Sequence, residues 1–355
     1  MVGSDDGRRH RPEEGKANMR AIVCSEPGKL ERVEVAAPPA PAPGLVAVDV
    51  RAVGICGTDF HILEGTHPFL AYPRVMGHEL SGVVAGGAAH ADLAPGTPVV
   101  VNPYLSCGHC VACRKGKPNC CATLKVLGVH VDGGMCERIL VPEENLYPAG
   151  DLSLRDAAMV EFQAIGAHAV RRSEMKAGDR VLVVGAGPIG VGTGIFARLA
   201  GGAVTLMDLS RPRLDFLADR AGFRESSGAG EDALAAIDRA TGGDRFDVVF
   251  DATGSAKAME RSFAFVASGG TLVLVGVRNA DITFSDPEFH RKEMTLKATR
   301  NAVRADFETV MAAIRARHVP MDALNTHGGS LDDLPEIMPA WLHSPELPLK
   351  AVVTV

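Results

Sequence analysis

Short apolar segments, broken by clusters of Pro and Gly, fill the chain from Met19 to about Leu146. Typical examples are RAIVC, LVAVDVRAVG, SGVVAGG and TPVVV. Brief apolar runs between turn-forming residues predict irregular β structure. The Pro/Ala-rich stretch at 36–44, AAPPAPAPG, is typical of a stiff connector between two such segments.

The pattern changes near Asp156, where DAAMVEFQAIGAHAVRR has helical spacing and leads into the apolar run RVLVVG. From Arg180 to about Lys297, buried-type strands (RVLVVG, AVTLMD, FDVVFDAT, GTLVLVG) alternate with helical segments (GVGTGIFARLA, PRLDFLADRAG). This alternation predicts an α/β unit with a parallel sheet. After Asn301 come an amphipathic helix, DFETVMAAIRARHV, and a final strand, LKAVVTV, which we expect to return to the first domain.

A chain of 355 residues exceeds what one hydrophobic core usually serves, so we expect two domains. The predicted division is a polar, disordered extension at 1–18, a β-rich domain at 19–163, a parallel α/β domain at 164–303, and a C-terminal return at 304–355. The extension lacks the apolar core of a secretory signal. We therefore expect a cytoplasmic protein whose natural start is Met19.

Composition narrows the choice of partners. Apolar residues make up 46% and charged residues 23% of the chain, which is ordinary for a globular protein. The net charge of −6, without an extended basic run, argues against nucleic acid. No apolar run is long enough to cross a bilayer, so we expect no membrane span. Four of the eight cysteines are clustered, which favours metal binding over disulfides.

A GxGxxG pattern follows the predicted strand RVLVVG and opens the next helix. Its members, with the two residues between the last glycines, are Gly185, Gly187, Pro188, Ile189 and Gly190. Glycines at these places let the backbone turn tightly and approach a pyrophosphate.

Asp208 ends the following strand, where a carboxylate accepts hydrogen bonds from ribose hydroxyls and repels the extra phosphate of NADP. We expect NAD as the cofactor. Arg211 and Arg213 lie just beyond, either as surface charges or as groups that soften this discrimination and touch the cofactor.

Cys107, Cys110 and Cys113 form a CxxCxxC pattern, and Cys121 follows after eight residues. Four thiolates from one compact loop suit a closed, tetrahedral structural zinc site. Spacing alone leaves Cys120 as an alternative to Cys121 for the fourth ligand.

A second, dispersed set of possible ligands consists of Cys56 in GICGTDFH, His78 and Glu79 in GHE, and Glu161. Each has an ordinary structural interpretation when taken alone: a small core thiol, a satisfied core imidazole, or a carboxylate on a helix or the surface.

Together with their surroundings, these residues resemble a known family. The motifs GICGTDFH, YPRVMGHELSG, CGHCVACRKGKPNCC, GVHVDGGMCERILVP and VLVVGAGPIG occur in this order from Met19 onward. The chain thereby resembles the zinc-containing medium-chain dehydrogenases, in particular their sorbitol and polyol branch. The resemblance implies a GroES-like catalytic domain, a Rossmann coenzyme domain and an active-site cleft between them.

The resemblance also implies individual roles. Cys56, His78 and Glu79 match ligands of a catalytic zinc, and Glu161 matches a carboxylate that binds the metal directly or through water. Thr58 matches the hydroxyl that receives the substrate proton, Asp59 a residue behind the ligands, and His61 a relay to solvent. The resemblance also favours Cys121 as the fourth thiolate of the structural zinc site. Arg300 matches an arginine that faces the cleft, with an interdomain salt bridge or subunit contact as the alternative. The stretch FQAIGAHAV departs from the family's commoner PLAVALHAV, which leaves the substrate's shape open.

We therefore expect an enzyme with two zinc ions per chain that moves a hydride from a secondary alcohol to NAD. Carboxylates in the metal shell fit a polyol or sugar acid that chelates through adjacent hydroxyls. The alternatives are a simple alcohol or threonine dehydrogenase and a catalytically silent, zinc- and NAD-binding sensor. A homodimer or homotetramer is expected.

Overall fold

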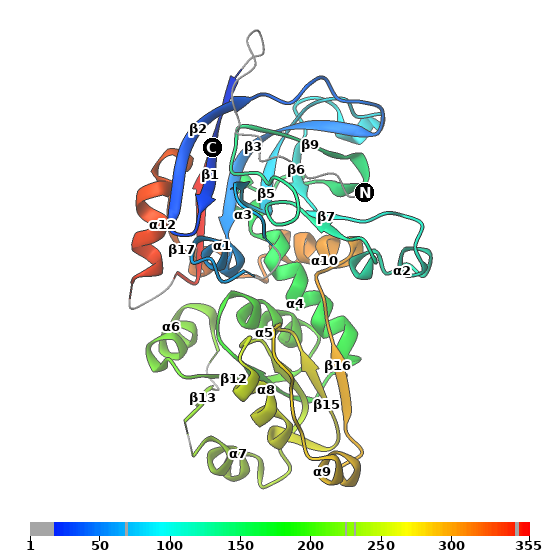
Figure 1. Ribbon diagram of the computed structural model, residues 1–355. Helices are drawn as coiled ribbons and strands as arrows, with labels where there is room; N and C mark the ends of the chain where they lie inside the picture. Colours follow the sequence, from blue (N-terminus) through cyan, green and yellow to red (C-terminus); the bar gives the residue numbers. More distant parts are fainter. Residues whose placement is uncertain (1–17, 68–69, 224–225, 231, 345–347) are drawn as a thin grey trace, which may run out of the picture.

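Two bodies make up the protein in the computed structural model, which describes residues 18–67, 70–223, 226–230, 232–344 and 348–355 (Figure 1). The upper body is built mainly of strands, and the lower body is a sheet flanked by helices. This arrangement confirms the predicted α/β class. Of the extension expected at 1–18, only Asn18 belongs to the described residues, and it begins β1.

The upper body holds two main sheets. The smaller is antiparallel, in the order β2 (Lys29–Ala36), β1 (Asn18–Glu26), β4 (Arg74–Val75). The larger runs β10 (Leu146–Pro148), β6 (Pro98–Val101), β5 (Glu79–Gly86), β3 (Leu45–Ile55), β18 (Lys350–Thr354), β17 (Asn325–Ser330), and β9 (Arg138–Pro142) also pairs with β3. A small pair, β7 (Tyr104–Leu105) and β8 (Lys125–Val126), stands apart. The irregular β structure expected before Leu146 is therefore present.

The lower body is a parallel sheet whose strands run β13 (Ser226–Gly228), β12 (Ala203–Asp208), β11 (Arg180–Val184), β14 (Phe246–Asp251), β15 (Val266–Leu274), β16 (Thr295–Ala298). Its helices are α5 (Pro188–Leu199), α6 (Arg211–Ala221), α7 (Ala233–Thr241), α8 (Ala256–Ser262) and α9 (Asp286–Arg291). The chain starts in the centre at β11 and winds outward first to one side and then to the other. In such sheets, ligands bind at the carboxyl ends of the strands where the winding reverses, here between β11 and β14.

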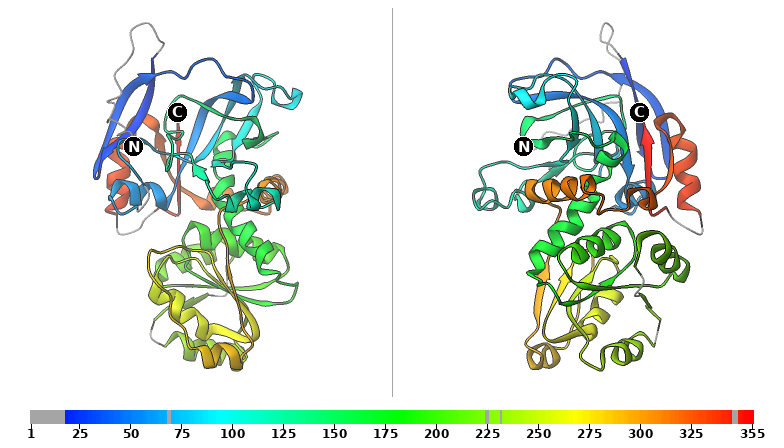
Figure 2. Two further views of the ribbon diagram at one scale, coloured as in Figure 1. Left: turned by 45° about the vertical axis from the view of Figure 1, so that its right-hand side comes forward. Right: turned by 180° about the vertical axis from the view of Figure 1, so that it is seen from behind.

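The helical segment predicted from Asp156 onward is divided in two. Helix α3 (Leu154–Ala158) ends at Met159, and α4 (Val160–Ser173) continues between the two bodies (Figure 2). Helices α4 and α5 approach closely at Gly166, where a Cβ atom would lie 2.5 Å from the backbone nitrogen of Thr193. One hydrophobic core runs through α4 into both bodies, so the bodies are joined by packing as well as by the chain.

The C-terminal segment returns to the upper body. It contains α10 (Arg304–Arg315), α11 (Met321–Leu324), α12 (Leu334–Leu342) and the two strands β17 and β18. Strand β18 lies antiparallel to β3 on one side and parallel to β17 on the other. Two short helices, α1 (Gly57–Leu63) and α2 (Val111–Arg114), leave the β-rich body at positions that matter for the sites below. None of the described helices combines the length and the apolar character that a bilayer crossing needs.

Candidate active site and metal centres

Cys56, His78 and Glu79 meet where β3 and β5 pair. Gly54 on β3 stands opposite Glu79 at the start of β5, and Cys56 follows as the N-cap of α1. One ligand atom from each of the three side chains lies within 4.8 Å of the others. A thiolate, an imidazole and a carboxylate form a donor set that fits zinc with a position left for substrate or water.

Asp59 lies behind two of these ligands. Its side chain is fully buried; one oxygen accepts a hydrogen bond from the Cys56 backbone N–H at 2.9 Å, and the other lies 3.9 Å from Nδ1 of His78. At 3.9 Å the contact with His78 is electrostatic and is not a hydrogen bond. Burial raises the pKa of Asp59, and the positive charge of His78 opposes that rise.

Lys350 on β18 is a residue that sequence reasoning missed. Its Nζ lies 2.6 and 2.7 Å from the two carboxylate oxygens of Glu79 and donates to the Ile55 carbonyl at 3.1 Å. Both side chains of the ion pair are buried. The Glu79 carboxylate passes directly over Gly54, where a Cβ atom would meet Oε2 at 2.3 Å. Glu79 therefore has a fixed cationic partner in addition to its place among the possible ligands.

Glu161, at the start of α4, is buried beside this group but is not one of the three atoms that share the 4.8 Å spacing. Tyr104, a second residue that sequence reasoning missed, donates its hydroxyl to one Glu161 oxygen, and the other oxygen has no protein partner. Burial raises the pKa of Glu161 to about 7, with Glu79 adding to the rise. This second oxygen can serve a metal as a ligand, directly or through water.

Helix α1 carries the two residues predicted to move the proton. Thr58 is half-buried in the first turn, and the His61 side chain is 58% exposed in the last turn. His61 Nδ1 lies 3.3 Å from the Thr66 hydroxyl and 3.5 Å from a Glu64 oxygen. The helix therefore leads from the ligand group toward solvent, but within the described part of the chain no hydrogen bond joins Thr58 to His61.

The four-cysteine site is formed by the loop around α2. The sulfurs of Cys107, Cys110, Cys113 and Cys121 lie within 4.8 Å of one another, and Cys120 is exposed outside them. Cys110 N donates to Cys107 Sγ at 3.4 Å, and Cys107 N to Cys121 Sγ at 3.3 Å. Backbone N–H groups of Cys113 and Ala122 lower the pKa of Cys110 to about 6, which favours the thiolate that zinc needs. The geometry places Cys121 with the other three thiols.

The glycine turn between β11 and α5 has the form that a dinucleotide requires. A Cβ at Gly190 would lie 1.7 Å from the Gly185 carbonyl oxygen, so only glycine fits there. Gly187 is the N-cap of α5 and faces open space, with Pro188 and Ile189 opening the helix. A helix N-terminus with free space before it can receive a pyrophosphate.

Asp208 holds this turn from the next strand. Its two oxygens accept hydrogen bonds from Ala186 N at 2.6 Å and Ser210 N at 2.8 Å. A carboxylate has about four lone pairs, so two directions remain for ribose hydroxyls. Arg213 lies in the first turn of α6, where its backbone N–H donates to the Ser210 hydroxyl. Arg211 pairs with Asp215 at 2.8 Å and is largely exposed.

Arg300 is exposed in the turn between β16 and α10, at the carboxyl edge of the parallel sheet. Within the described part of the chain, no carboxylate lies at ion-pair distance from its guanidinium. The predicted alternative of an interdomain salt bridge therefore finds no partner among those residues. The guanidinium is available to a ligand.

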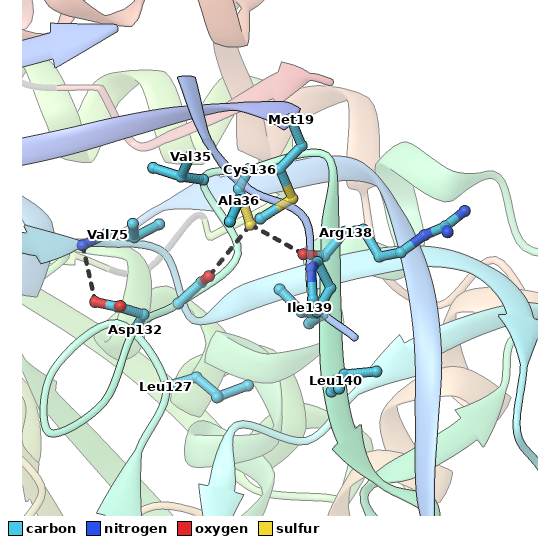
Figure 3. Close-up of a pocket in the computed structure, with 12 residues that line it drawn as sticks. Met19, Val35, Ala36, Val75, Leu127, Asp132, Cys136, Arg138, Ile139 and Leu140 are labelled. Carbon is cyan, nitrogen blue, oxygen red and sulfur yellow. Dashed lines mark hydrogen bonds between the residues drawn. The ribbon is translucent and has the colours of Figure 1, made fainter. Parts of the chain in front are cut away.

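A pocket elsewhere in the β-rich body contains none of these residues (Figure 3). Its lining is mainly apolar and includes Met19, Val35, Leu127 and Ile139, with the Cys136 thiol on its wall. Burial raises the pKa of Cys136 to about 12, and the thiol donates to backbone carbonyls of Gly133 and Arg138. The raised pKa keeps this thiol protonated, and the two charged side chains of the lining, Asp132 and Arg138, are held in ion pairs with Arg74 and Asp49.

Sequence similarity to known proteins extends over both bodies of the structure. Residues 42–151 match the alcohol dehydrogenase GroES-like domain, and residues 188–316 match the zinc-binding dehydrogenase family. The chain is 40% identical to L-galactonate-5-dehydrogenase of Escherichia coli (strain K12) over 88% of this chain and 92% of that protein.

Two solved structures are similar over nearly the whole chain. A short chain alcohol dehydrogenase from Escherichia coli CFT073, complexed with NADH, has a TM-score of 0.88 and 28% identity, covering 95% of this chain and 99% of the other. A putative zinc-binding dehydrogenase from Sinorhizobium meliloti 1021, bound to NADP, has a TM-score of 0.86 and 29% identity, covering 96% and 100%. With a four-cysteine site, a dinucleotide turn and these relatives, the chain belongs to the zinc-containing medium-chain alcohol and polyol dehydrogenases, in their sorbitol dehydrogenase-like branch.

Proposed function

We propose that the protein oxidises a secondary hydroxyl of a sugar acid and passes the hydride to NAD. As a member of this family, the protein is a zinc-dependent NAD(P) dehydrogenase of the polyol and sugar-acid branch. The proposal adds the anionic substrate and the preference for NAD. Its main support is the exposed guanidinium of Arg300 at the carboxyl edge of the parallel sheet, which has no ion-pair partner among the described residues and suits a carboxylate.

Arg300 is one of three positive side chains near the loop that holds His130. The loop that carries His130 packs on the backbone of Gly77, directly before His78, because a Cβ at Gly128 would lie 2.7 Å from Gly77 N. Burial lowers the pKa of His130, and the charges of Arg300, Arg74 and Lys125 lower it further. Arg74 is paired with Asp132 at 3.0 Å, so the field that favours an anionic substrate comes mainly from Arg300 and Lys125.

The residues of the site have separate roles in the proposed reaction. Cys56, His78 and Glu79 would hold the zinc, with Glu161 beside them directly or through water. When bound, zinc polarises the substrate oxygen and the nicotinamide accepts the hydride. Thr58 would receive the hydroxyl proton and release its own, and His61, in the last turn of α1, would exchange protons with solvent.

The coenzyme is held by the glycine turn at Gly185, Gly187 and Gly190, with Asp208 on the ribose hydroxyls. The carboxylate of Asp208 disfavours the additional phosphate of NADP by charge repulsion and supports the choice of NAD.

NADH formation by the purified protein across aldonates, neutral polyols, threonine and simple alcohols tests the proposal. Aldonates should give the highest kcat/KM with NAD. Arg300→Ala should lower kcat/KM for aldonates roughly 10- to 150-fold, since a charge-assisted hydrogen bond contributes about 1.5–3 kcal/mol, and should change neutral polyols little. Arg304→Ala, a nearby exposed arginine on α10, serves as the control.

Each alternative has its own outcome. Equal losses for aldonates and neutral polyols in Arg300→Ala would give Arg300 a structural role. A preference for threonine or a simple alcohol would replace the proposed substrate class. Zinc and NAD binding without turnover of any substrate would support the silent sensor.

A further inference from the structure

Asn119 connects the four-cysteine lobe to the turn that carries Arg300. It lies on the 3-10 turn Pro118–Cys120, directly before the thiol ligand candidate Cys121, and is 4% exposed. Its Nδ2 donates to the backbone carbonyl of Arg300 at 2.8 Å and lies 3.3 Å from His168 Nε2 on α4. One buried amide therefore contacts both the domain-joining helix and the edge of the coenzyme sheet.

The hydrogen bonds around His168 form a consistent chain. Nδ1 of His168 lies 2.8 Å from one Asp306 oxygen, and Arg171 Nη2 lies 3.1 Å from the same oxygen and 3.0 Å from Nδ1. When Nδ1 carries the proton, the Asp306 carboxylate accepts from both groups. Nε2 is then the acceptor that Asn119 Nδ2 needs. Asp306 is anchored in turn by Arg171 Nε at 2.8 Å and Val303 N at 2.9 Å. Burial raises the pKa of Asp306, but the hydrogen bonds from His168 and Arg171 outweigh it and the net pKa is lowered.

The segment that Asn119 holds is a short crossing between β16 and α10. Asn301 within it has φ of +51°, a left-handed conformation that few residues other than glycine adopt readily. Because the peptide group is planar, fixing the Arg300 carbonyl fixes the plane between Arg300 and Asn301. Together with the ψ angle of Arg300, that plane sets the direction in which the side chain leaves the backbone.

A second contact holds the start of the same crossing without involving the lobe. Arg172 Nε on α4 donates to the Ala298 carbonyl at 2.9 Å. The position of Arg300 itself depends on Asn119, since this is the side chain that bonds to its carbonyl.

We propose that Asn119 is a positioning residue through which the four-cysteine lobe sets the direction of Arg300 in the cleft. The lobe then has a role in substrate discrimination beyond local stability. The link to the substrate rests on the proposed function, whereas the link between Asn119 and the crossing does not.

Hydrogen exchange measured by mass spectrometry tests the structural link without any substrate. In Asn119→Ala, amides of residues 299–303 should exchange roughly five- to tenfold faster, as expected for the loss of one buried hydrogen bond. Cys120→Ser, an exposed neighbour on the same turn, should leave this exchange unchanged. Zinc content must stay at the wild-type value; Asn119→Asp, which keeps the size but removes the donor, gives a second reading if the alanine variant loses metal.

A double-mutant cycle tests whether Asn119 acts through Arg300. On the best substrate, Asn119→Ala should raise KM roughly five- to tenfold with a smaller change in kcat, and should have less than about a twofold effect when Arg300 is already alanine. Arg172→Ala, which loosens the crossing at Ala298, should add to Arg300→Ala independently.

Two results would overturn the inference: unchanged exchange at 299–303 in both Asn119 variants, or the same loss from Asn119→Ala with and without Arg300. Failure of the proposed function is seen separately, in the wild-type substrate panel.

Discussion

The buried pair between Lys350 and Glu79 predicts how strongly the fold depends on zinc. The Lys350 side chain is 1% exposed and that of Glu79 is 0% exposed, with both carboxylate oxygens within 2.7 Å of Nζ. Lys350→Met leaves the Glu79 charge buried without its cation and also removes the donor to the Ile55 carbonyl. Breaking a buried pair in this way costs about 3–5 kcal/mol of unfolding free energy.

A zinc ion on Glu79 replaces part of the lost positive charge. The loss of unfolding free energy in Lys350→Met should therefore be smallest with zinc bound and largest after the metal has been removed. In linkage terms, the variant should bind the catalytic zinc more tightly, by about tenfold or more, which corresponds to about 1.4 kcal/mol. Removing a competing cation from a carboxylate ligand always acts in this direction.

Denaturant unfolding with added zinc and with a chelator measures the effect as a difference between the two midpoints. This gap should be wider in Lys350→Met than in wild type. Lys292→Met is the matched control: Lys292 is also buried, but its Nζ donates to the Val266 carbonyl and has no place among the possible ligands. The control should lose some stability with the gap unchanged. A gap in Lys350→Met equal to or narrower than that of wild type would refute the reasoning.

Three further predictions concern the other sites. Metal analysis should find about two zinc ions per chain; Cys113→Ser should lose one of them and lower the melting temperature, while Cys120→Ser should lose none. Asp208→Ala should raise KM for NAD and weaken discrimination against NADP in steady-state assays, and unchanged values for both cofactors would exclude Asp208 from the ribose site. Gly190→Ala should abolish or strongly weaken NADH binding in a fluorescence titration, because its Cβ would lie 1.7 Å from the Gly185 carbonyl; wild-type affinity would contradict the assigned turn.

Local spacing explains why much of the site was predictable. The glycine turn and the four-cysteine loop each lie within one short stretch, so their chemistry follows from a few neighbouring residues. The alternation of strands and helices after Arg180 likewise predicts the parallel sheet. Spacing alone could not show whether Cys120 or Cys121 is the fourth thiol ligand. Adjacent residues are at almost the same distance along the chain from the other cysteines, and only the structure shows in which direction each side chain points.

Long-range partners explain what was missed. Lys350 and Tyr104 touch Glu79 and Glu161 through strand pairing and packing that no local spacing encodes. A signal for Lys350 was present, since a lysine opens an otherwise apolar strand, LKAVVTV, that was expected to return to the first domain. The break at Met159 was hidden because apolar spacing continues through it, and only the backbone separates α3 from α4.

Strand β18 has a consequence for how the protein is made. It pairs with β3, yet the Lys350 Nζ and the Ile55 carbonyl that it contacts belong to residues 295 positions apart. During synthesis, β3 leaves the ribosome long before β18 exists, and closing so large a loop is slow. A nascent chain therefore carries an open strand edge and an unpaired Glu79 until its last segment arrives. Chains that stop before β18 would expose that edge to chaperones and proteases. Only chains that extend through β18 would therefore complete the catalytic centre.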